Sequence, residues 1–203
     1  MIPVQEILYK TIQGEGFYSG SSCDFIRLYG CPVGCSYCDT GYAMGTTPPP
    51  FTTLDYQELK LESDFVVISG GEPMIHKNLP ALCRYLLKQK KFVTIETSGA
   101  FFQPVPDNVW VTLSPKEHLN SKMKISPAVW KRADEYKFVL SKLSDLHYYQ
   151  EKHQNRLRKK YLKYIQPEWN EYENHTLSET LDFISQNPEY KLSLQTHKLI
   201  GIP

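Results

Sequence analysis

Charge of one sign is not in excess in this chain. Its 203 residues hold 23 Lys and Arg against 22 Asp and Glu, so no overall field favours a nucleic acid or a membrane surface as partner. No apolar run is long enough to span a bilayer, and residues 1–6 lack the basic region and apolar core of a signal peptide. We therefore expect a cytoplasmic protein whose partner is a small molecule held in a pocket.

The number and the distribution of the cysteines argue against a disulfide framework. There are five cysteines, an odd number, and three of them fall within eight residues. Secreted disulfide scaffolds usually contain an even set of cysteines in a short chain. The pattern instead favours a reducing compartment and a metal site.

The cysteine loop, residues 31–38, lacks a fourth ligand. Cys31, Cys35 and Cys38 stand in the order C-x-x-x-C-x-x-C, and the nearest histidine, His76, lies far downstream. Structural zinc requires a closed set of four ligands. An iron–sulfur cubane is usually held by four thiolates, so three leave one iron open to an external ligand, which suits catalysis. The spacing favours such a cluster; zinc, a disulfide and inert thiols are the alternatives.

Strand and helix patterns alternate along the chain. Apolar, β-rich runs predict strands at 25–29, 65–69, 91–97, 109–114, 136–140 and 161–166, and helical periodicity covers 79–89, 177–186 and, more weakly, 143–150. This order predicts parallel βα units. The connection 99–108 contains Pro104 and Pro106 and has little room for a helix, so a barrel would be incomplete there. No repeat or linker divides the chain, and one domain over residues 1–203 is expected. The basic run 156–163 is expected at a solvated helix end.

Polar and glycine-rich segments follow the predicted strands. They are the cysteine loop and residues 69–73, 96–99, 114–116 and 166–167. Ligands of parallel sheets gather at the carboxyl ends of the strands, so these segments are expected to line a single pocket. Gly70 and Gly71 alone would be more typical of an ordinary turn, but beside the cysteine loop they favour a close approach of the backbone to a ligand.

The cysteine spacing, followed by Gly70-Gly71-Glu72-Pro73, resembles the radical S-adenosylmethionine superfamily. The resemblance implies an α/β fold, a modified and incomplete (βα) barrel, with a 4Fe–4S cluster on the three cysteines. The open iron would bind the amino and carboxylate groups of S-adenosylmethionine, whose cleavage yields a 5′-deoxyadenosyl radical. The resemblance also implies that the cofactor contacts Tyr37, Cys38, Asp39, Gly70, Gly71, Glu72, Glu96, Ser98, Ser114, Pro115, Lys116, Gln166 and Pro167, with Tyr37 against the adenine and Glu96 on the ribose hydroxyls.

A narrower resemblance points to the 7-carboxy-7-deazaguanine synthase family. It rests on residues 11–16, Arg27, Asp39-Thr40, and the tail 195–198 with 201–203. It implies a carbon–nitrogen lyase that rearranges 6-carboxy-5,6,7,8-tetrahydropterin into 7-carboxy-7-deazaguanine and releases ammonia, in queuosine and related deazapurine biosynthesis. It also implies Mg²⁺, an electron donor such as flavodoxin or ferredoxin, and a homodimer.

The same resemblance implies the substrate site. The pterin would contact Ile12, Gln13, Gly14, Glu15, Arg27, Ser69, His197 and the terminal carboxylate of Pro203, and Thr40 would bind magnesium. The chemistry of these side chains fits these roles. Glu15 can accept hydrogen bonds from the amidine edge of a pterin, the guanidinium of Arg27 can pair with a carboxylate through two N–H groups, and Thr40 offers magnesium a hard oxygen ligand. The alternatives are a structural ion pair for Arg27, turn roles for Glu15 and Thr40, and a core position for His197.

Two other functions fit the cysteine loop. One is a small activating enzyme that installs a glycyl radical on a protein partner, which has no need of the pterin-reading residues. The other is a non-catalytic iron–sulfur electron carrier, which a fourth cysteine would favour. Cys23 and Cys83 lie outside the loop and are expected to be small buried apolar residues.

Overall fold

The computed structural model describes residues 1–41, 47, 49–120, 122–158, 162–171 and 176–202. Within these residues nine strands form one sheet in the order β3-β1-β2-β4-β5-β6-β7-β8-β9. The strands are β1 (Ile2–Ile12), β2 (Ser22–Leu28), β3 (Thr52–Leu54), β4 (Phe65–Gly70), β5 (Phe92–Thr97), β6 (Trp110–Leu113), β7 (Glu135–Leu140), β8 (Lys163–Pro167) and β9 (Tyr190–Leu192). The helices are α1 (Leu79–Lys88), α2 (Pro127–Arg132), α3 (Ser144–Leu157), α4 (Leu177–Gln186) and α5 (Thr196–Leu199).

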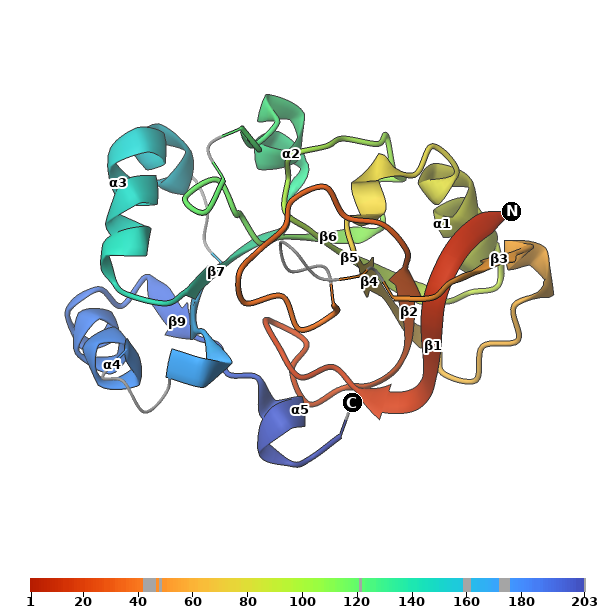
Figure 1. Ribbon diagram of the computed structural model, residues 1–203, viewed down its shortest axis with the longest axis horizontal. Helices are drawn as coiled ribbons and strands as arrows, with labels where there is room; N and C mark the ends of the chain where they lie inside the picture. Colours follow the sequence, from red (N-terminus) through yellow and green to blue (C-terminus); the bar gives the residue numbers. More distant parts are fainter. Residues whose placement is uncertain (42–46, 48, 121, 159–161, 172–175, 203) are drawn as a thin grey trace.

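The sheet is an open, incomplete barrel. All neighbouring strands from β2 to β9 are parallel, whereas β1 is antiparallel to both β2 and β3. The two edges, β3 and β9, are not paired with each other. Figure 1 shows α1 to α4 around the outside of the curved sheet and α5 beside the open side, close to the segment that follows β1. The expected fold class is confirmed.

Most of the predicted elements are present. The six predicted strands match β2 and β4 to β8, although residue 161 lies outside the described residues, and α1 and α4 lie where the periodicity placed them. No helix connects β5 to β6, as the prolines predicted. Helix α3 is longer than predicted, and Lys163, expected at a solvated helix end, is instead buried in β8. The single domain over residues 1–203 stays a prediction.

The longest strand was not predicted. Strand β1 contains two irregularities in its pairing with β2, between Val4 and Glu6 and between Leu8 and Thr11. Such bulges shift which residues face the core, so the period of two that identifies a strand is broken. Short elements that gain their stability from tertiary packing, namely α2, α5, β3 and β9, were also missed.

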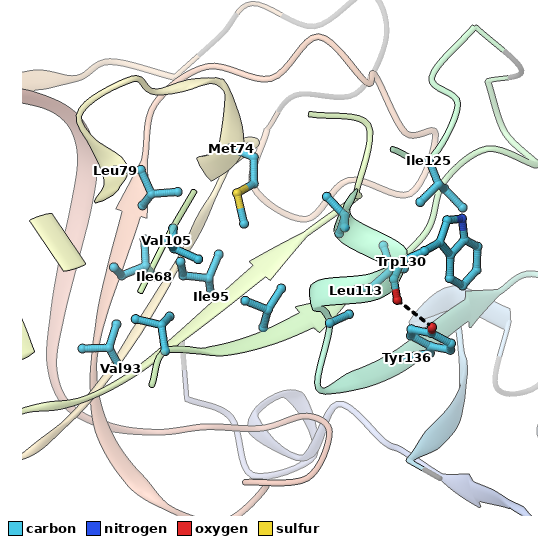
Figure 2. Close-up of a cluster of buried hydrophobic side chains, with 14 of the residues drawn as sticks. Ile68, Met74, Leu79, Val93, Ile95, Val105, Leu113, Ile125, Trp130 and Tyr136 are labelled. Carbon is cyan, nitrogen blue, oxygen red and sulfur yellow. Dashed lines mark hydrogen bonds between the residues drawn. The ribbon is translucent and has the colours of Figure 1, made fainter. Parts of the chain in front are cut away.

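A buried apolar cluster joins the helices to the sheet. Leu79, Leu82, Cys83 and Leu86 occupy one face of α1 and are fully buried, because their spacing places them on the same side of the helix. Figure 2 shows this cluster continuing through the strands to α2, where the Tyr136 hydroxyl donates to the carbonyl of Trp130 at 3.0 Å. Cys23 and Cys83 are both buried, as expected. None of the helices in the described part of the chain has the length and apolar character to cross a membrane.

We expect Leu86→Ala to lower the free energy of unfolding by about 2–5 kcal/mol, because it removes apolar surface and leaves a cavity in the core. Leu181→Ala is the matched control on α4, where the leucine is 48% exposed, and it should change stability by less than about 0.5 kcal/mol. Urea unfolding measures both. Equal effects of the two substitutions would contradict the assignment of the core.

Candidate active site

Two adjoining cavities lie at the carboxyl ends of the parallel strands. The larger has an empty volume of about 840 Å³ and is lined by all three cysteines of the cysteine loop. The smaller has an empty volume of about 560 Å³ and is lined by the segment that follows β1, by β2 and by α5. The cavities share six lining residues, Glu15, Asp39, Thr40, Ser69, Gly70 and Glu96. A ligand in one cavity would therefore lie edge to edge with a ligand in the other.

Most of the site residues predicted from the sequence line one or both of the two cavities. Of the expected cofactor contacts, the larger cavity contains Tyr37, Cys38, Asp39, Gly70, Gly71, Glu72, Glu96, Ser98, Ser114, Lys116 and Gln166. Pro115 and Pro167 are buried at strand ends and line neither cavity. The expected substrate contacts Ile12, Gln13, Gly14, Glu15, Arg27, Ser69 and His197 line the smaller cavity, together with Thr40. Pro203 lies outside the described residues.

The cysteine loop presents its thiols to the larger cavity. Cys31, Cys35 and Cys38 are all partly exposed and free of disulfides. Burial is the main cause that raises the pKa of Cys31 to about 11, and it raises the pKa of Cys35 as well. Bound iron would supply the positive charge that such thiolates need. Among the described residues no three His, Cys, Asp or Glu side chains are grouped around one metal ion; in a cubane each thiolate takes a different iron. The loop thus fits a cluster with one open iron.

The two glycines after β4 are required by close backbone packing. Gly70 has φ +123°, and a Cβ on it would lie 2.2 Å from the carbonyl oxygen of Leu28. A Cβ on Gly71 would lie 2.1 Å from the carbonyl oxygen of Gly30. The amide of Gly71 donates to Leu28 at 2.8 Å. The glycines therefore let the end of β4 lie directly against the start of the cysteine loop.

Glu72 fastens the turn after β4 to the end of β5. One carboxylate oxygen accepts from the Met74 amide at 3.0 Å and from the Thr97 hydroxyl at 2.6 Å. The other accepts from the amide of Ser98 at 2.8 Å and from its hydroxyl. With four donors from the protein, this buried carboxylate holds the wall of the larger cavity in place.

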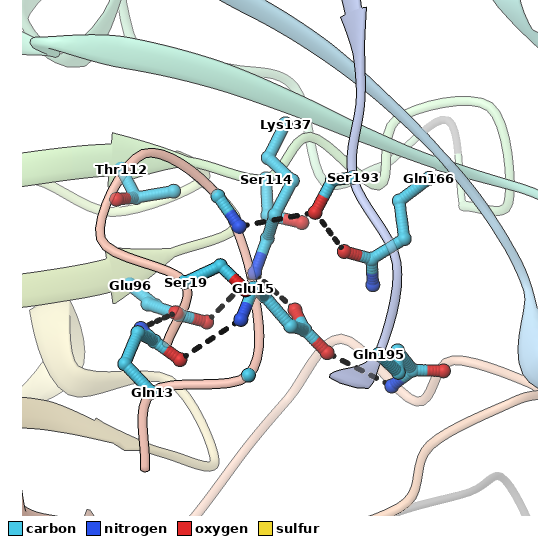
Figure 3. A network of polar contacts seen from close by, with 12 residues as sticks. Gln13, Glu15, Ser19, Glu96, Thr112, Ser114, Lys137, Gln166, Ser193 and Gln195 are labelled. Carbon is cyan, nitrogen blue, oxygen red and sulfur yellow. Dashed lines mark hydrogen bonds and ion pairs between the residues drawn. The ribbon is translucent and has the colours of Figure 1, made fainter. Parts of the chain in front are cut away.

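Lys137 connects the carboxylates of both cavities. Its ammonium pairs with Glu15 and, at 3.0 Å, with Glu96 (Figure 3). Glu96 also accepts from the Gln13 side chain at 2.9 Å, and Glu15 from the Gln195 side chain at 2.9 Å. Sequence reasoning missed Lys137, although a charged residue inside the apolar run of β7 was a visible signal of the same kind as Arg27 in β2.

The charged forms of Glu15 and Lys137 are favoured by their ion pairs and hydrogen bonds more than burial disfavours them. Burial alone would raise the pKa of Glu15, but attraction to Lys137 and hydrogen bonds from Lys137 and Gln195 outweigh it and lower that pKa to about 2. For Lys137, burial is likewise outweighed by the two carboxylates, and its pKa is raised. Both groups are therefore charged at neutral pH.

The C-terminal segment, residues 195–202, lines one side of the smaller cavity through His197. Thr196 donates to the Gly14 carbonyl through its amide at 3.0 Å and its hydroxyl at 2.9 Å. A Cβ on Gly14 would lie 2.0 Å from Nδ1 of His197, so only glycine leaves room for that ring. Lys198 pairs with Asp39 at 3.2 Å and ties the segment to the cysteine loop. Burial lowers the pKa of His197.

Arg27 and Thr40 both have protein partners and both line the smaller cavity. Nε of Arg27 lies 2.8 Å from a Glu6 carboxylate oxygen, and its guanidinium lies 5.1 Å from the ring centre of Phe25. The structural ion pair and the cavity position therefore coexist in Arg27. The Thr40 hydroxyl donates to the Gly70 carbonyl at 3.2 Å and lies 3.4 Å from Sγ of Cys38, and its oxygen can still accept a further contact.

We expect Glu72→Gln to destabilise the fold by about 1–3 kcal/mol, because the amide –NH₂ would face protein donors instead of accepting from them. Glu58→Gln, at an exposed glutamate, is the matched control and should leave stability unchanged. Thermal or urea unfolding of the two variants measures the difference. A Glu72→Gln variant as stable as the wild type would overturn the structural role of this carboxylate.

Known protein families and solved structures that are similar to this chain agree with this geometry. The model of the radical SAM superfamily matches residues 25–109. The 7-carboxy-7-deazaguanine synthase of Flavobacterium psychrophilum is 34% identical over 206 residues, which cover 100% of this chain and 93% of the relative. That of Synechocystis sp. is 34% identical over 216 residues, covering 100% of this chain and 99% of the relative. The crystal structure of QueE from Escherichia coli, 28% identical, superimposes with a TM-score of 0.80 and covers 95% of this chain and 93% of that one. The chain belongs to the 7-carboxy-7-deazaguanine synthase family, within the radical S-adenosylmethionine superfamily.

Proposed function

We propose that this protein converts 6-carboxy-5,6,7,8-tetrahydropterin into 7-carboxy-7-deazaguanine with loss of ammonia. The observation that carries the proposal is the pair of adjoining cavities, one with three cysteine thiols and the other with Arg27, Gln13 and Glu15. This arrangement supplies a place for a cluster and its cofactor beside a place for a carboxylated heterocycle. Relatives that match the whole chain are named for this product. Their similarity favours this reaction over glycyl-radical activation or simple electron transfer.

The cofactors of this family are a 4Fe–4S cluster, S-adenosylmethionine and Mg²⁺. When bound, the cluster and S-adenosylmethionine supply a radical able to abstract a hydrogen atom. The chain itself binds and orients the ligands: Cys31, Cys35 and Cys38 hold the cluster, while the walls from β4 to β8 surround the cofactor.

Each substrate contact follows from the chemistry of the cavity wall. Arg27 faces the smaller cavity with a guanidinium suited to the carboxylate of the pterin. Glu15 is ionised and can accept hydrogen bonds from the amidine edge of the pterin. Gln13 and its neighbouring backbone would form the other hydrogen bonds to the ring. Glu96 is placed at the shared wall, where its carboxylate can accept from the ribose hydroxyls.

Magnesium would bind at the boundary of the two cavities. Thr40 lines both of them, and a hydroxyl oxygen is a ligand of the kind that Mg²⁺ accepts alongside waters and substrate oxygens. Thr40 would hold the ion there, close to the carboxylate of the pterin.

The electron donor, the oligomeric state and the compartment are part of the same proposal. An external donor such as flavodoxin or ferredoxin would reduce the cluster, and the protein would act as a homodimer. None of the five cysteines is in a disulfide, which supports a reducing compartment, the cytoplasm.

Product formation tests the proposal directly. The chain is reconstituted anaerobically with iron and sulfide, then supplied with reductant, S-adenosylmethionine, Mg²⁺ and the carboxytetrahydropterin. We expect 7-carboxy-7-deazaguanine by its absorbance and mass, and Cys35→Ser, which lacks a cluster ligand, should form none. Deoxyadenosine without the deazapurine would refute the substrate but retain the superfamily chemistry. A full iron complement that yields neither the deazapurine nor deoxyadenosine would refute the radical reaction.

We expect Thr40→Ala to retain the cluster and to change the magnesium dependence of the reaction, because the hydroxyl ligand is lost. Thr53→Ala, at an exposed position of edge strand β3, is the matched control and should keep the wild-type response. The measurement is the rate of product formation across a magnesium titration, with iron content determined in parallel. A wild-type response in Thr40→Ala would exclude Thr40 as a ligand.

A further inference from the structure

We propose that Lys137 is the positioning residue that holds the substrate-binding carboxylate of Glu15 and the cofactor-binding carboxylate of Glu96 in one fixed arrangement. The inference rests on the proposed function, because it assigns Glu15 to the pterin and Glu96 to S-adenosylmethionine. It adds a residue that itself need not touch either ligand. Its action would be exerted through the two carboxylates.

The geometry places one ammonium between two carboxylates from separate parts of the chain. Lys137 lies on β7, Glu15 on the turn after β1, and Glu96 on β5 (Figure 3). The side chain of Lys137 is 2% exposed, against 13% for Glu15 and 17% for Glu96, so water screens these pairs only weakly. Lys137 and both carboxylates line the larger cavity, and the carboxylates also line the smaller one.

Other polar contacts fix the outer faces of the two carboxylates. Glu96 is held from the side of β1 by Gln13, and Glu15 from the C-terminal segment by Gln195. Both of these partners are neutral amides. Among the described residues Lys137 is the one cation paired with either carboxylate, so both ion pairs are lost when its ammonium is removed.

Removal of this ammonium would leave two carboxylates close together in a buried site. Like charges and burial both favour the neutral acid, so the pKa of Glu15 would rise from its present low value. A protonated Glu15 can no longer accept from both N–H groups of an amidine edge. Binding of the pterin would then weaken as the pH falls through the raised pKa. The charged or titratable groups that face this pair from the surrounding elements are Arg27, Asp39, Lys116, Glu135, His197 and Lys198.

The test is ligand binding to the cluster-loaded protein as a function of pH. Dissociation constants of the carboxytetrahydropterin and of S-adenosylmethionine are measured between pH 6.5 and 8.5 for the wild type and Lys137→Met. In the wild type, Glu15 stays ionised, and His197, whose pKa burial lowers, stays neutral, so affinity should vary little. In Lys137→Met, pterin affinity should fall by about tenfold for each pH unit below the raised pKa of Glu15. Affinity for S-adenosylmethionine should fall as well, because Glu96 is no longer fixed.

Three further variants separate positioning from general destabilisation. Lys137→Arg keeps the charge and should keep binding largely independent of pH. Lys137→Met/Glu96→Gln removes one carboxylate charge with the ammonium, so it avoids two unpaired buried charges, yet Glu15 remains unpaired and its pH-dependent loss should persist. Lys163→Met removes another buried lysine, on neighbouring β8 and outside both cavities, and should bind like the wild type.

The outcomes are distinct. Wild-type protein that does not bind the pterin at all would refute the proposed function. Wild-type protein that binds it, with Lys137→Met showing the same affinity and the same flat pH profile, would refute the role of Lys137 alone. A pH-independent loss shared by Lys137→Met and Lys163→Met would also refute it, since that would reflect stability. If Lys137→Met does not fold, the double variant decides by the same criteria.

Discussion

The ion pairs of Lys137 with Glu15 and Glu96 are the constraint around which the site is arranged. A charge in the interior is costly unless it is paired and hydrogen-bonded, and here one buried ammonium compensates two carboxylates. Because the three groups come from β7, β5 and the turn after β1, their pairing also fixes how that turn enters the open barrel. Gln13 and Glu15, which we propose bind the substrate, are held against the wall of the larger cavity by hydrogen bonds to Glu96 and Lys137.

The open barrel brings the remaining parts of the site together. Parallel strands from β2 to β8 end at the same side, so the cysteine loop, the turn after β4 and the ends of β5 and β6 surround one cavity. The unclosed edge leaves space for the C-terminal segment. There Thr196 donates to the Gly14 carbonyl and Lys198 pairs with Asp39, so the segment links the turn after β1 to the residue that follows the cysteine loop.

The sequence was sufficient for features that depend on neighbouring residues. The three-cysteine loop, the polar strand ends and the faces of α1 and α4 are local patterns, and all could be predicted. Features that depend on distant partners could not: Lys137 pairs with Glu15 across 122 positions and with Glu96 across 41, and no local period encodes such a pair. Strand β1 was missed because its bulges break the alternation. The packing role of Gly70 likewise required the backbone of Leu28 to be seen against it.

The central claim is that cofactor and substrate meet at the shared wall of two adjoining cavities. Its most direct test is the fate of the hydrogen at C6 of the carboxytetrahydropterin, which we propose is the hydrogen that the radical abstracts. The reconstituted protein is supplied with substrate deuterated at C6, and the recovered S-adenosylmethionine and 5′-deoxyadenosine are analysed by mass spectrometry. Direct contact between the two ligands predicts that deuterium appears in the 5′-deoxyadenosyl group. Deazapurine formation with no deuterium in that group would contradict the account.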